Sequence, residues 1–451
     1  MISGCADLAP KYDVPAVDTP VAFKEGQGSW IRAAPADALS RGPWWALFED
    51  PVLDGLVSQV AVTNQNVAAA AAAYAQARAL TREQRAPLFP AVDLGSSANR
   101  SGAGGGGGAH GSYQVNIGAS WEPDVWGRIA NTVASARGNE QASAADLAAA
   151  TLSAQGELAV DYFGLREADL LHASQAETVK GYERSLTITR NRYNVGVAAR
   201  TDVLQAESQL ATAQADLIAL ERTRAQFEHG IAVLIGKAPA DFTLAADANW
   251  RPRVPGIPLE LPSTLLQRRP DIAAAERRVY AANARIGVER AGYYPDIRLS
   301  ASAGLAAAHI GDLFKSSSLV WSLGATLAQT IFDAGATSAR VDEARAGMEE
   351  AAARYRQTVL SAFEDVENQL VALRVLQQQV SLRQQAFDAA VLVEQQVLNR
   401  YRSGLVSYTE VVTAQATSAS ARRALVQVQN DREVAAVSLI QALGGGWKGM
   451  Q

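Results

Sequence analysis

Strict alternation between apolar and small polar residues marks two short stretches of the chain. In YQVNIGASW (113–121) and in WSLGATL (321–327) every second residue is apolar. Residues 296–304 alternate in the same way, and residues 91–99 precede the first stretch as these precede the second. A period of two places the apolar side chains on one face of a strand. The pattern predicts four strands in two pairs, at about 91–99 with 113–121 and 296–304 with 318–329.

Apolar residues facing one way and small polar residues facing the other are typical of strands in an outer-membrane β-barrel. A half-buried strand of a soluble sheet has the same period. Four such strands with little other apolar sequence to cover them favour the membrane. The glycine-rich stretch SGAGGGGGAHG (101–111) lacks the Lys-Ser/Thr of a phosphate loop and joins two strands. We therefore expect an external loop there and a counterpart at about 305–317.

A different period follows the second pair of strands. No proline occurs from Gly335 to Tyr401, and apolar residues recur at spacings of three and four, as in a coiled coil. The seam consists of Phe363, Val366, Leu370, Leu373, Val380, Phe387, Val391, Leu398 and Tyr401, with Gln377, Gln384 and Glu394 interrupting it. This predicts a helix over about 335–402, on the order of 100 Å long, and a returning helix over about 409–443. The chain is thus expected to be mainly α-helical.

The turn between these helices occurs twice. RYNVGVAARTDVLQAESQL (192–210) and RYRSGLVSYTEVVTAQATS (400–418) match at an offset of 208 positions. In the first copy Gly196 can end one helix in the left-handed conformation, and Thr201 can cap the next. The offset also relates Leu152-Ser153-Ala154 to Leu360-Ser361-Ala362 and Gly236 to Gly444. The chain is therefore a tandem duplication, and the first half should hold the same helix pair, at about 127–194 and 201–235.

These patterns divide the chain into five segments. Residues 1–43 form an N-terminal stretch and an extended, proline-containing tether. Residues 44–236 and 263–446 are the two repeats, and within the first one residues 44–86 are expected to be helical. Between the repeats, residues 237–262 hold five of the sixteen prolines and form a linker. Residues 447–451 are a C-terminal tail.

Composition excludes several classes of function. The net charge of −5, without a long basic run, argues against nucleic acid as a partner. The single cysteine excludes an internal disulfide framework, and the four histidines are too far apart in sequence for a metal motif. No run of 18 apolar residues is present for a transmembrane helix. No motif assembles a nucleophile, a base and an orienting group, so we expect neither an enzyme nor a cofactor.

The cysteine lies in MISGCAD, where Ile2-Ser3-Gly4-Cys5 is similar to the end of a bacterial lipobox. In a lipobox the cysteine is lipidated and becomes the mature N-terminus. The charged and apolar regions of a signal peptide are not among the four residues before Cys5. The expectation is a lipid on Cys5, and the alternative is an exposed thiol without a function.

Four strands cannot close a barrel, and lipid does not tolerate an open sheet edge. The barrel must then be assembled from several chains, with eight strands from two chains or twelve from three. The long helix pairs would form a coaxial tube that ends in a ring of repeated turns. This explains why one chain builds the same hairpin twice.

The chain resembles the outer membrane factors, the TolC-like exit ducts of tripartite efflux pumps, and in particular the lipoprotein branch similar to OprM and NodT. The most specific parts are PWWALFEDPVLDGLVSQV (43–60), SWEPDVWGRI (120–129), LLQRRPDIAAAERRV (265–279) and the two hairpins. The resemblance implies a homotrimer with a twelve-stranded barrel in the outer membrane, a periplasmic α-barrel, a lipid on Cys5 and no catalysis. It also implies a periplasmic adaptor and an inner-membrane transporter, which we expect to be of the RND type, as partners in exporting small molecules.

The resemblance also assigns roles at the hairpins. The turns Val195-Gly196-Val197 and Ser403-Gly404-Leu405 would dock the adaptor. A polar ring of Asp202, Arg400, Tyr401 and Glu410 would close the periplasmic end. Ordinary helix capping is the competing explanation for the two acids. The sequence departs from related ducts at Thr413, where an Asp is common, and at Val406, where a charged residue is common, so the closure would depend less on salt bridges.

Two alternatives remain open at this point. The duct could belong to a type I system and export proteins instead of small molecules. The chain could also be a soluble coiled-coil scaffold with a small accessory sheet, although this leaves the matching strands of the two halves unexplained.

Overall fold

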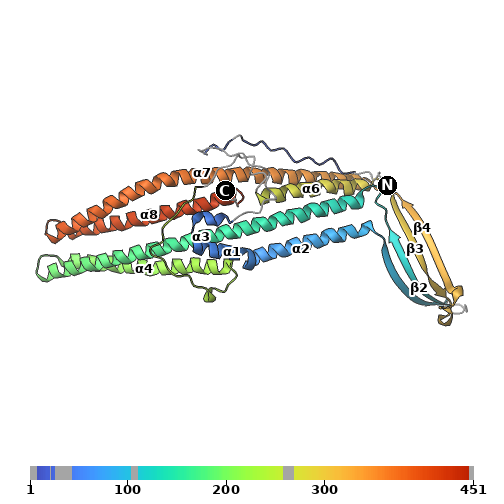
Figure 1. Ribbon diagram of the computed structural model, residues 1–451, viewed down its shortest axis with the longest axis horizontal. Coiled ribbons are helices and arrows are strands. Elements are labelled where there is room, and N and C mark those ends of the chain that lie inside the picture. The colour runs from blue at the N-terminus through green and yellow to red at the C-terminus, as the bar shows by residue number, and fades with distance from the viewer. Residues whose placement is uncertain (1–7, 21, 26–42, 103–109, 257–268, 446–451) are drawn as a thin grey trace. The chain divides into compact units, whose positions relative to one another are not determined.

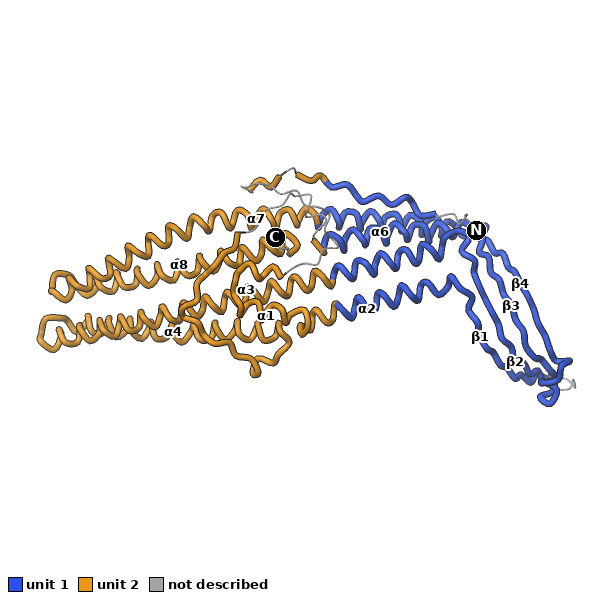
Figure 2. Tube along the Cα trace, in the orientation of Figure 1, with its two compact units in different colours: residues 1–17, 71–146, 271–358 blue, residues 18–70, 147–270, 359–451 orange. Residues whose placement is uncertain are grey.

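The computed structural model describes residues 8–20, 22–25, 43–102, 110–256 and 269–445, arranged in two compact units (Figures 1 and 2). The first unit contains residues 1–17, 71–146 and 271–358, and the second contains residues 18–70, 147–270 and 359–451. No helix in the described residues has an apolar stretch long enough to cross a bilayer.

The first unit carries a four-stranded antiparallel sheet in the order β1-β2-β3-β4. The strands are β1 (Ala91–Ser101), β2 (His110–Trp121), β3 (Asp296–Ala307) and β4 (Leu319–Ala328). The register places Ile117 opposite Leu94 on one side and Ala303 on the other, and Ala303 opposite Trp321. Residues directly opposite one another share a face of the sheet. The apolar positions of all four strands therefore lie on one face, as the alternation predicts.

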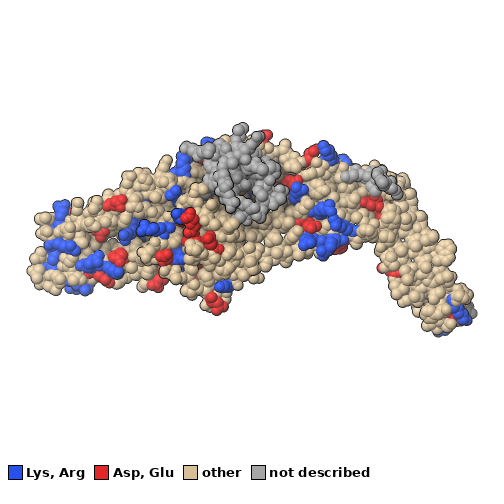
Figure 3. Space-filling view, in the orientation of Figure 1, with Lys and Arg blue, Asp and Glu red and all other residues tan. Residues whose placement is uncertain are grey.

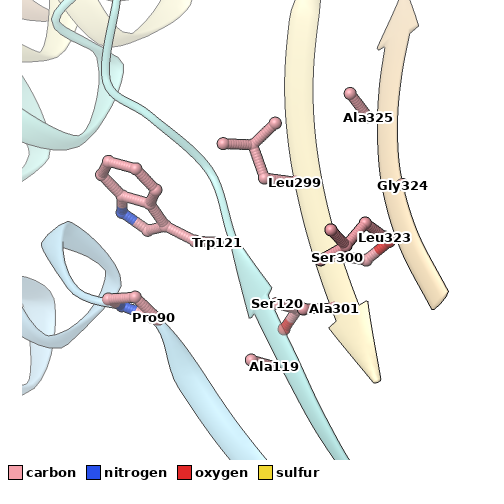
Figure 4. Close-up of a pocket in the computed structure, with 10 residues that line it drawn as sticks. All are labelled: Pro90, Ala119, Ser120, Trp121, Leu299, Ser300, Ala301, Leu323, Gly324 and Ala325. Carbon is pink, nitrogen blue, oxygen red and sulfur yellow. The ribbon is translucent and has the colours of Figure 1, made fainter. Parts of the chain in front are cut away.

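This apolar face is uncovered. Leu94, Trp321 and Leu323 are 75%, 72% and 77% exposed, which is unusual for large apolar side chains in a soluble protein. The visible surface of the sheet carries few charged side chains (Figure 3). Near one end of the face, Trp121 and Leu299 extend to the same side beside Pro90 (Figure 4). The Trp121 Nε1 donates a hydrogen bond to the Leu88 carbonyl (3.1 Å), so the polar atom of the indole is bonded while its ring lies on the apolar face, an arrangement that suits the aromatic girdle of a barrel.

Helix α6 (Pro270–Ala291) leads into β3, and it is the counterpart in the second repeat of the helix that leads into β1. The apolar pattern of the sequence did not predict this helix. The start of the described chain lies along it. Asn283 Nδ2 donates to the Pro10 carbonyl (2.8 Å), Arg290 Nη1 donates to the Leu8 carbonyl (3.1 Å), and the Tyr12 ring meets the Tyr280 ring edge-on at 5.2 Å. These contacts hold the tether against the helix that leads into β3.

Two helical hairpins account for most of the residues in the repeats. Helix α3 (Arg128–Asn194) is followed by α4 (Arg200–Leu234), and α7 (Ala336–Arg402) is followed by α8 (Tyr408–Ala442). The offset of 208 positions holds for every one of these boundaries. The prediction that Thr201 caps the second helix is wrong: the N-cap is Ala199, because the helix already begins at Arg200.

The segment at residues 44–86 is not one helix. It divides into a 3-10 turn (Trp44–Phe48), α1 (Pro51–Thr63), α2 (Gln65–Arg85) and a second 3-10 turn (Ala86–Leu88). Asp50 caps α1 by accepting the backbone N–H groups of Val52 and Leu53, and Pro51 suits the first helical position. Asn64 takes an extended conformation and ends α1, and its side chain then accepts the N–H of Asn66 at the start of α2.

The core of the second unit is built on the 3-10 turn, α1 and parts of α3, α4 and α8. Its largest fully buried side chains include Leu53, Tyr162, Phe163, Ile231 and Ile440. The carboxylate of Asp50 also joins distant segments, since its Oδ2 accepts the Tyr162 hydroxyl (2.7 Å) and the Trp250 indole N–H (3.1 Å).

The linker is tied to this core by a buried ion network. Asp169 accepts hydrogen bonds from Arg166 (3.0 Å) and Arg224 (2.7 Å), and also from the backbone N–H of Asp247 (3.0 Å). Arg166 in turn donates to the Ala245 carbonyl (3.0 Å). Three donors on one buried carboxylate balance the cost of removing it from water.

Candidate functional site: the hairpin tips

Each hairpin of the second unit ends in the same tight turn. Gly196 and Gly404 have φ values of +76° and +78°, and the residue after each donates its N–H to a carbonyl five positions back, in a Schellman-type helix end. A Cβ at Gly196 would meet nothing within 4 Å, so the left-handed backbone alone requires glycine at this turn.

Apolar side chains stand exposed around the turns. Val195, Val197 and Leu405 are 74%, 63% and 70% exposed, and Ser403 is exposed as well. The residues predicted for adaptor docking are thus all at the surface of the chain. Such side chains at a tip do nothing for the packing of the chain that carries them.

Tyr401 is not at the surface. It is 2% exposed and packs with Leu186 of the first hairpin and with Tyr408, whose ring centroid lies 5.6 Å away. Its hydroxyl lies 3.2 Å from the Thr189 Oγ1. The guanidinium of Arg192 covers its ring at 4.6 Å and donates to its carbonyl (2.5 Å). Tyr401 therefore links the two hairpins within one chain.

The other residues predicted for the polar ring make local contacts. Asp202 Oδ2 accepts the Ala199 N–H (3.4 Å), and Glu410 Oε1 accepts the Ser407 N–H (3.3 Å), each at the start of its own helix. Thr413 donates to the Thr409 carbonyl (3.0 Å). Arg400 is exposed. Within a single chain the two acids thus act as helix-start residues, as the capping explanation expects, while Arg400 remains available to another chain.

Three residues that contact Tyr401 were not predicted from the sequence: Thr189, Arg192 and Tyr408. Burial raises the pKa of Tyr408 to about 12, and the nearby Tyr401, Tyr182 and Asp202 add to the shift. The repeat contained a usable signal, because Arg192 is the counterpart of Arg400. No local pattern indicated Thr189.

A buried carboxyl lies farther along α8. Glu433 is fully buried, and its Oε1 accepts the N–H of Arg253 in the linker (2.7 Å), while its Oε2 has no partner in the described structure. Burial raises its pKa to about 8, and repulsion by Asp50 contributes, against the opposing effects of the Arg253 hydrogen bond and the charge of Arg432. Glu433 is therefore expected to be largely protonated at neutral pH.

This carboxyl makes the stability of the second unit depend on pH. Because its pKa is raised in the folded state, the unfolded chain releases the proton first, and the free energy of unfolding falls as pH rises from about 5 to about 9. Glu433→Gln keeps the acceptor for Arg253 and cannot ionise. We expect the variant to unfold at a higher temperature than the wild type above about pH 8, with the two converging near pH 5. Parallel melting curves at all pH values would contradict this.

Among the described residues no three His, Cys, Asp or Glu side chains come together as a metal site. Cys5, predicted to carry a lipid, lies outside the described residues. The geometry thus comprises a sheet with an uncovered apolar face, two coiled-coil hairpins and a pair of tips with exposed apolar residues.

A comparison with protein families decides what this architecture is. The profile of the family described as outer membrane efflux protein matches residues 56–237 and 261–445, one match in each repeat. The chain belongs to this family. The resemblance noted in the sequence is confirmed, and the two matches coincide with the internal duplication.

Individual relatives span the whole chain. The sequence is 32% identical over 460 residues to the probable efflux pump outer membrane protein TtgC of Pseudomonas putida, covering 99% of this chain and 94% of that protein. The solved outer-membrane channel OprN is 30% identical, with a TM-score of 0.88 over 98% of this chain and 100% of the other. The open-state MtrE channel of Neisseria gonorrhoeae is also 30% identical, with a TM-score of 0.88 and 98% coverage of both. The mainly helical fold with four strands per chain is that of these channels.

Proposed function

We propose that this protein is the outer-membrane exit duct of a tripartite efflux pump, a passive conduit for small toxic molecules. The observation that carries the proposal is a sheet whose two edges pair with no strand in the described part of the chain and whose apolar face is uncovered there, joined to duplicated helical hairpins. Three copies would give a twelve-stranded barrel, in which every edge finds a partner. No catalytic step is required, and we propose no enzymatic activity.

The energy and the choice of cargo would come from partners. An inner-membrane transporter, which we take to be of the RND type, would load the pump, and a periplasmic adaptor would connect it to this duct. The exposed Val195, Val197 and Leu405 at the two turns supply apolar contacts for such an adaptor. Gly196, Ser403 and Gly404 between them leave the backbone open to close approach.

The ends of the hairpins would also form the gate. In this proposal Tyr401 holds the two hairpins of one chain together, and Asp202, Arg400 and Glu410 act between chains around the axis. Thr413 adds no charge to this ring. A lipid on Cys5 would anchor the N-terminus in the inner leaflet of the outer membrane.

The names of the relatives indicate different exported compounds. TtgC and SrpC are named for toluene and solvent efflux, and CusC of Escherichia coli, 29% identical, for cation efflux. The relatives named for toluene and solvent efflux are 32% identical to this chain, against 29% for CusC, which leads us to propose lipophilic organic compounds first. Protein export is the second candidate, and metal cations are the third.

The test begins with assembly and continues with transport. The full chain, purified in detergent, is expected to be a trimer by light scattering. Deleting its gene in the native host should increase accumulation of a lipophilic dye and sensitivity to toluene, with tolerance of toxic metal cations unchanged. Plasmid-borne wild type should restore both, whereas a variant with the docking turns replaced, Val195→Asp with Leu405→Asp, should assemble but not restore.

Each outcome bears on one part of the proposal. A stable monomer would contradict the barrel. A trimer whose loss changes only the tolerance of metal cations would replace organic cargo with cations, and a trimer whose loss abolishes secretion of a protein would support the type I alternative. Restoration by the turn variant would show that the adaptor docks elsewhere.

A further inference from the structure

The sheet of the first unit has two outer edges that pair with no other strand among the described residues. These edges belong to β1 and β4, because the order is β1-β2-β3-β4. Unpaired backbone groups in a hydrocarbon environment cost several kcal/mol each, so both edges must be satisfied if the sheet crosses the membrane. The inference below rests on the trimeric barrel proposed above and concerns how its seams are formed.

The two β-hairpins of the chain are copies of one unit. In the first, Ala91 of β1 pairs with Ser120 of β2, and in the second, Asp296 of β3 pairs with Ala328 of β4. Ser120 and Ala328 are separated by the 208 positions that relate the helices, whereas Ala91 and Asp296 are separated by 205. The repeat therefore maps β2 onto β4 and β1 onto β3, each at a fixed offset.

The two β-hairpins are joined to one another within the chain where β2 pairs with β3, and this pairing is called the β2–β3 joint. If the barrel repeats its unit, the same joint recurs where β4 meets β1 of the next copy. We infer that β4 pairs antiparallel with β1 of the partner subunit in the register of the β2–β3 joint. Ile117 opposite Ala303 then becomes Ala325 opposite Ala98 of the partner subunit.

Two properties of the side chains agree with this register. First, the apolar face of the sheet stays continuous between the two chains. The pair Ala119 and Ala301 becomes Leu327 opposite the partner's Ser96, which lies on the apolar side. A slip by one residue would turn the apolar residues inward. The face alone does not distinguish slips by two residues, so a second property is needed.

The second property is the fit of glycine to asparagine. Within the chain, Gly304 lies opposite Asn116, and a Cβ on Gly304 would come within 2.6 Å of the Asn116 Cα. At the seam the mapped pair is Gly324 opposite the partner's Asn99, so a glycine again faces an asparagine, with the strands exchanged. A slip by two residues places Asn99 opposite Ser322 or Thr326 and loses this match.

Cysteine pairs test the register directly. Ala325→Cys combined with Ala98→Cys is expected to give rapid cross-linking between chains with a short bifunctional thiol reagent, seen as a covalent trimer on a denaturing gel. Ala325→Cys with Ser96→Cys and Ala325→Cys with Arg100→Cys are matched variants for slips by two residues in either direction, and should react much more slowly. Each single variant controls for Cys5, and Ile117→Cys with Ala303→Cys controls for the reaction within one chain.

The outcomes separate the register from the trimer. Faster cross-linking of either shifted pair, or a detergent-stable trimer in which none of the pairs reacts, would overturn the register and leave the duct intact. If light scattering shows a monomer and no pair reacts between chains, the trimer and the register both fail.

Discussion

Gly304→Ala should abolish assembly of the protein into trimers. A Cβ at this position would lie 2.3 Å from the Val115 carbonyl oxygen and 2.6 Å from the Asn116 Cα. Both are backbone atoms of the neighbouring strand, so no side chain can rotate away to make room. The methyl group would force β2 and β3 apart where the two β-hairpins of the chain meet, and in lipid the parted backbone groups would have no water to bond.

The matched control is Gly118→Ala. Gly118 lies on β2, on the same small-polar face, and a Cβ there would meet nothing within 4 Å. We expect its trimer yield to equal that of the wild type, while Gly304→Ala leaves monomer or degraded protein in the membrane fraction. Equal trimer yields for both variants would mean that β2 and β3 are farther apart in the membrane than in this structure.

Alternation and repetition predicted much of this fold because both are local or periodic properties of the sequence. A period of two assigned Ile117 and Leu323 to one face of the sheet, and the register confirms it. The turn at Gly196 could be predicted because only glycine takes the left-handed conformation there without strain. Its copy at Gly404 followed from the repeat.

Other features depend on contacts between distant segments, and no local pattern contained them. Asp169 and Arg166 resemble an ordinary surface pair spaced three apart on a helix, yet both are buried because the linker folds over them. The break at Asn64 was missed because asparagine is tolerated within helices, and here its amide donates to the Leu234 carbonyl 170 residues away.

The candidate site at the hairpin tips shows the same difference between local features and long-range contacts. Its candidate residues were proposed because the hairpins repeat and resemble a known family, whereas the contacts of their side chains were not predicted. Tyr401 was expected to bond a carboxylate of a neighbouring hairpin as part of the polar ring, whereas in this structure its hydroxyl lies beside Thr189 of the other hairpin. Which side chain meets which across the two hairpins depends on how the coiled coils pack, and this is set by all their buried residues together.

The largest functional effect is expected from opening the tips. A variant combining Asp202→Ala, Arg400→Ala and Tyr401→Phe should raise single-channel conductance in planar bilayers several-fold and more than any single change. Arg400 is exposed and Asp202 is half-buried. An ion pair near the surface contributes only about 0–1 kcal/mol, so single variants at Asp202 or Arg400 should have small effects, and high salt should weaken closure. Tyr401→Phe removes only the hydroxyl bonded to Thr189, so Thr189→Val should raise conductance to the same extent.

Variants of Asp202 can distinguish a role in closing the gate from a role in capping helix α4. Its carboxylate accepts the Ala199 N–H at the start of α4, and an alanine would lose both the charge and this bond. Asp202→Asn keeps an oxygen for the bond and removes only the charge. If Asp202 holds the gate through its charge, both variants raise conductance and thermal stability falls only for alanine. If it is only a cap, asparagine behaves as wild type and alanine lowers helix content without opening the channel.

Thr413→Asp, which adds a charge to the ring, should lower the resting conductance, and an unchanged value would place Thr413 outside the gate.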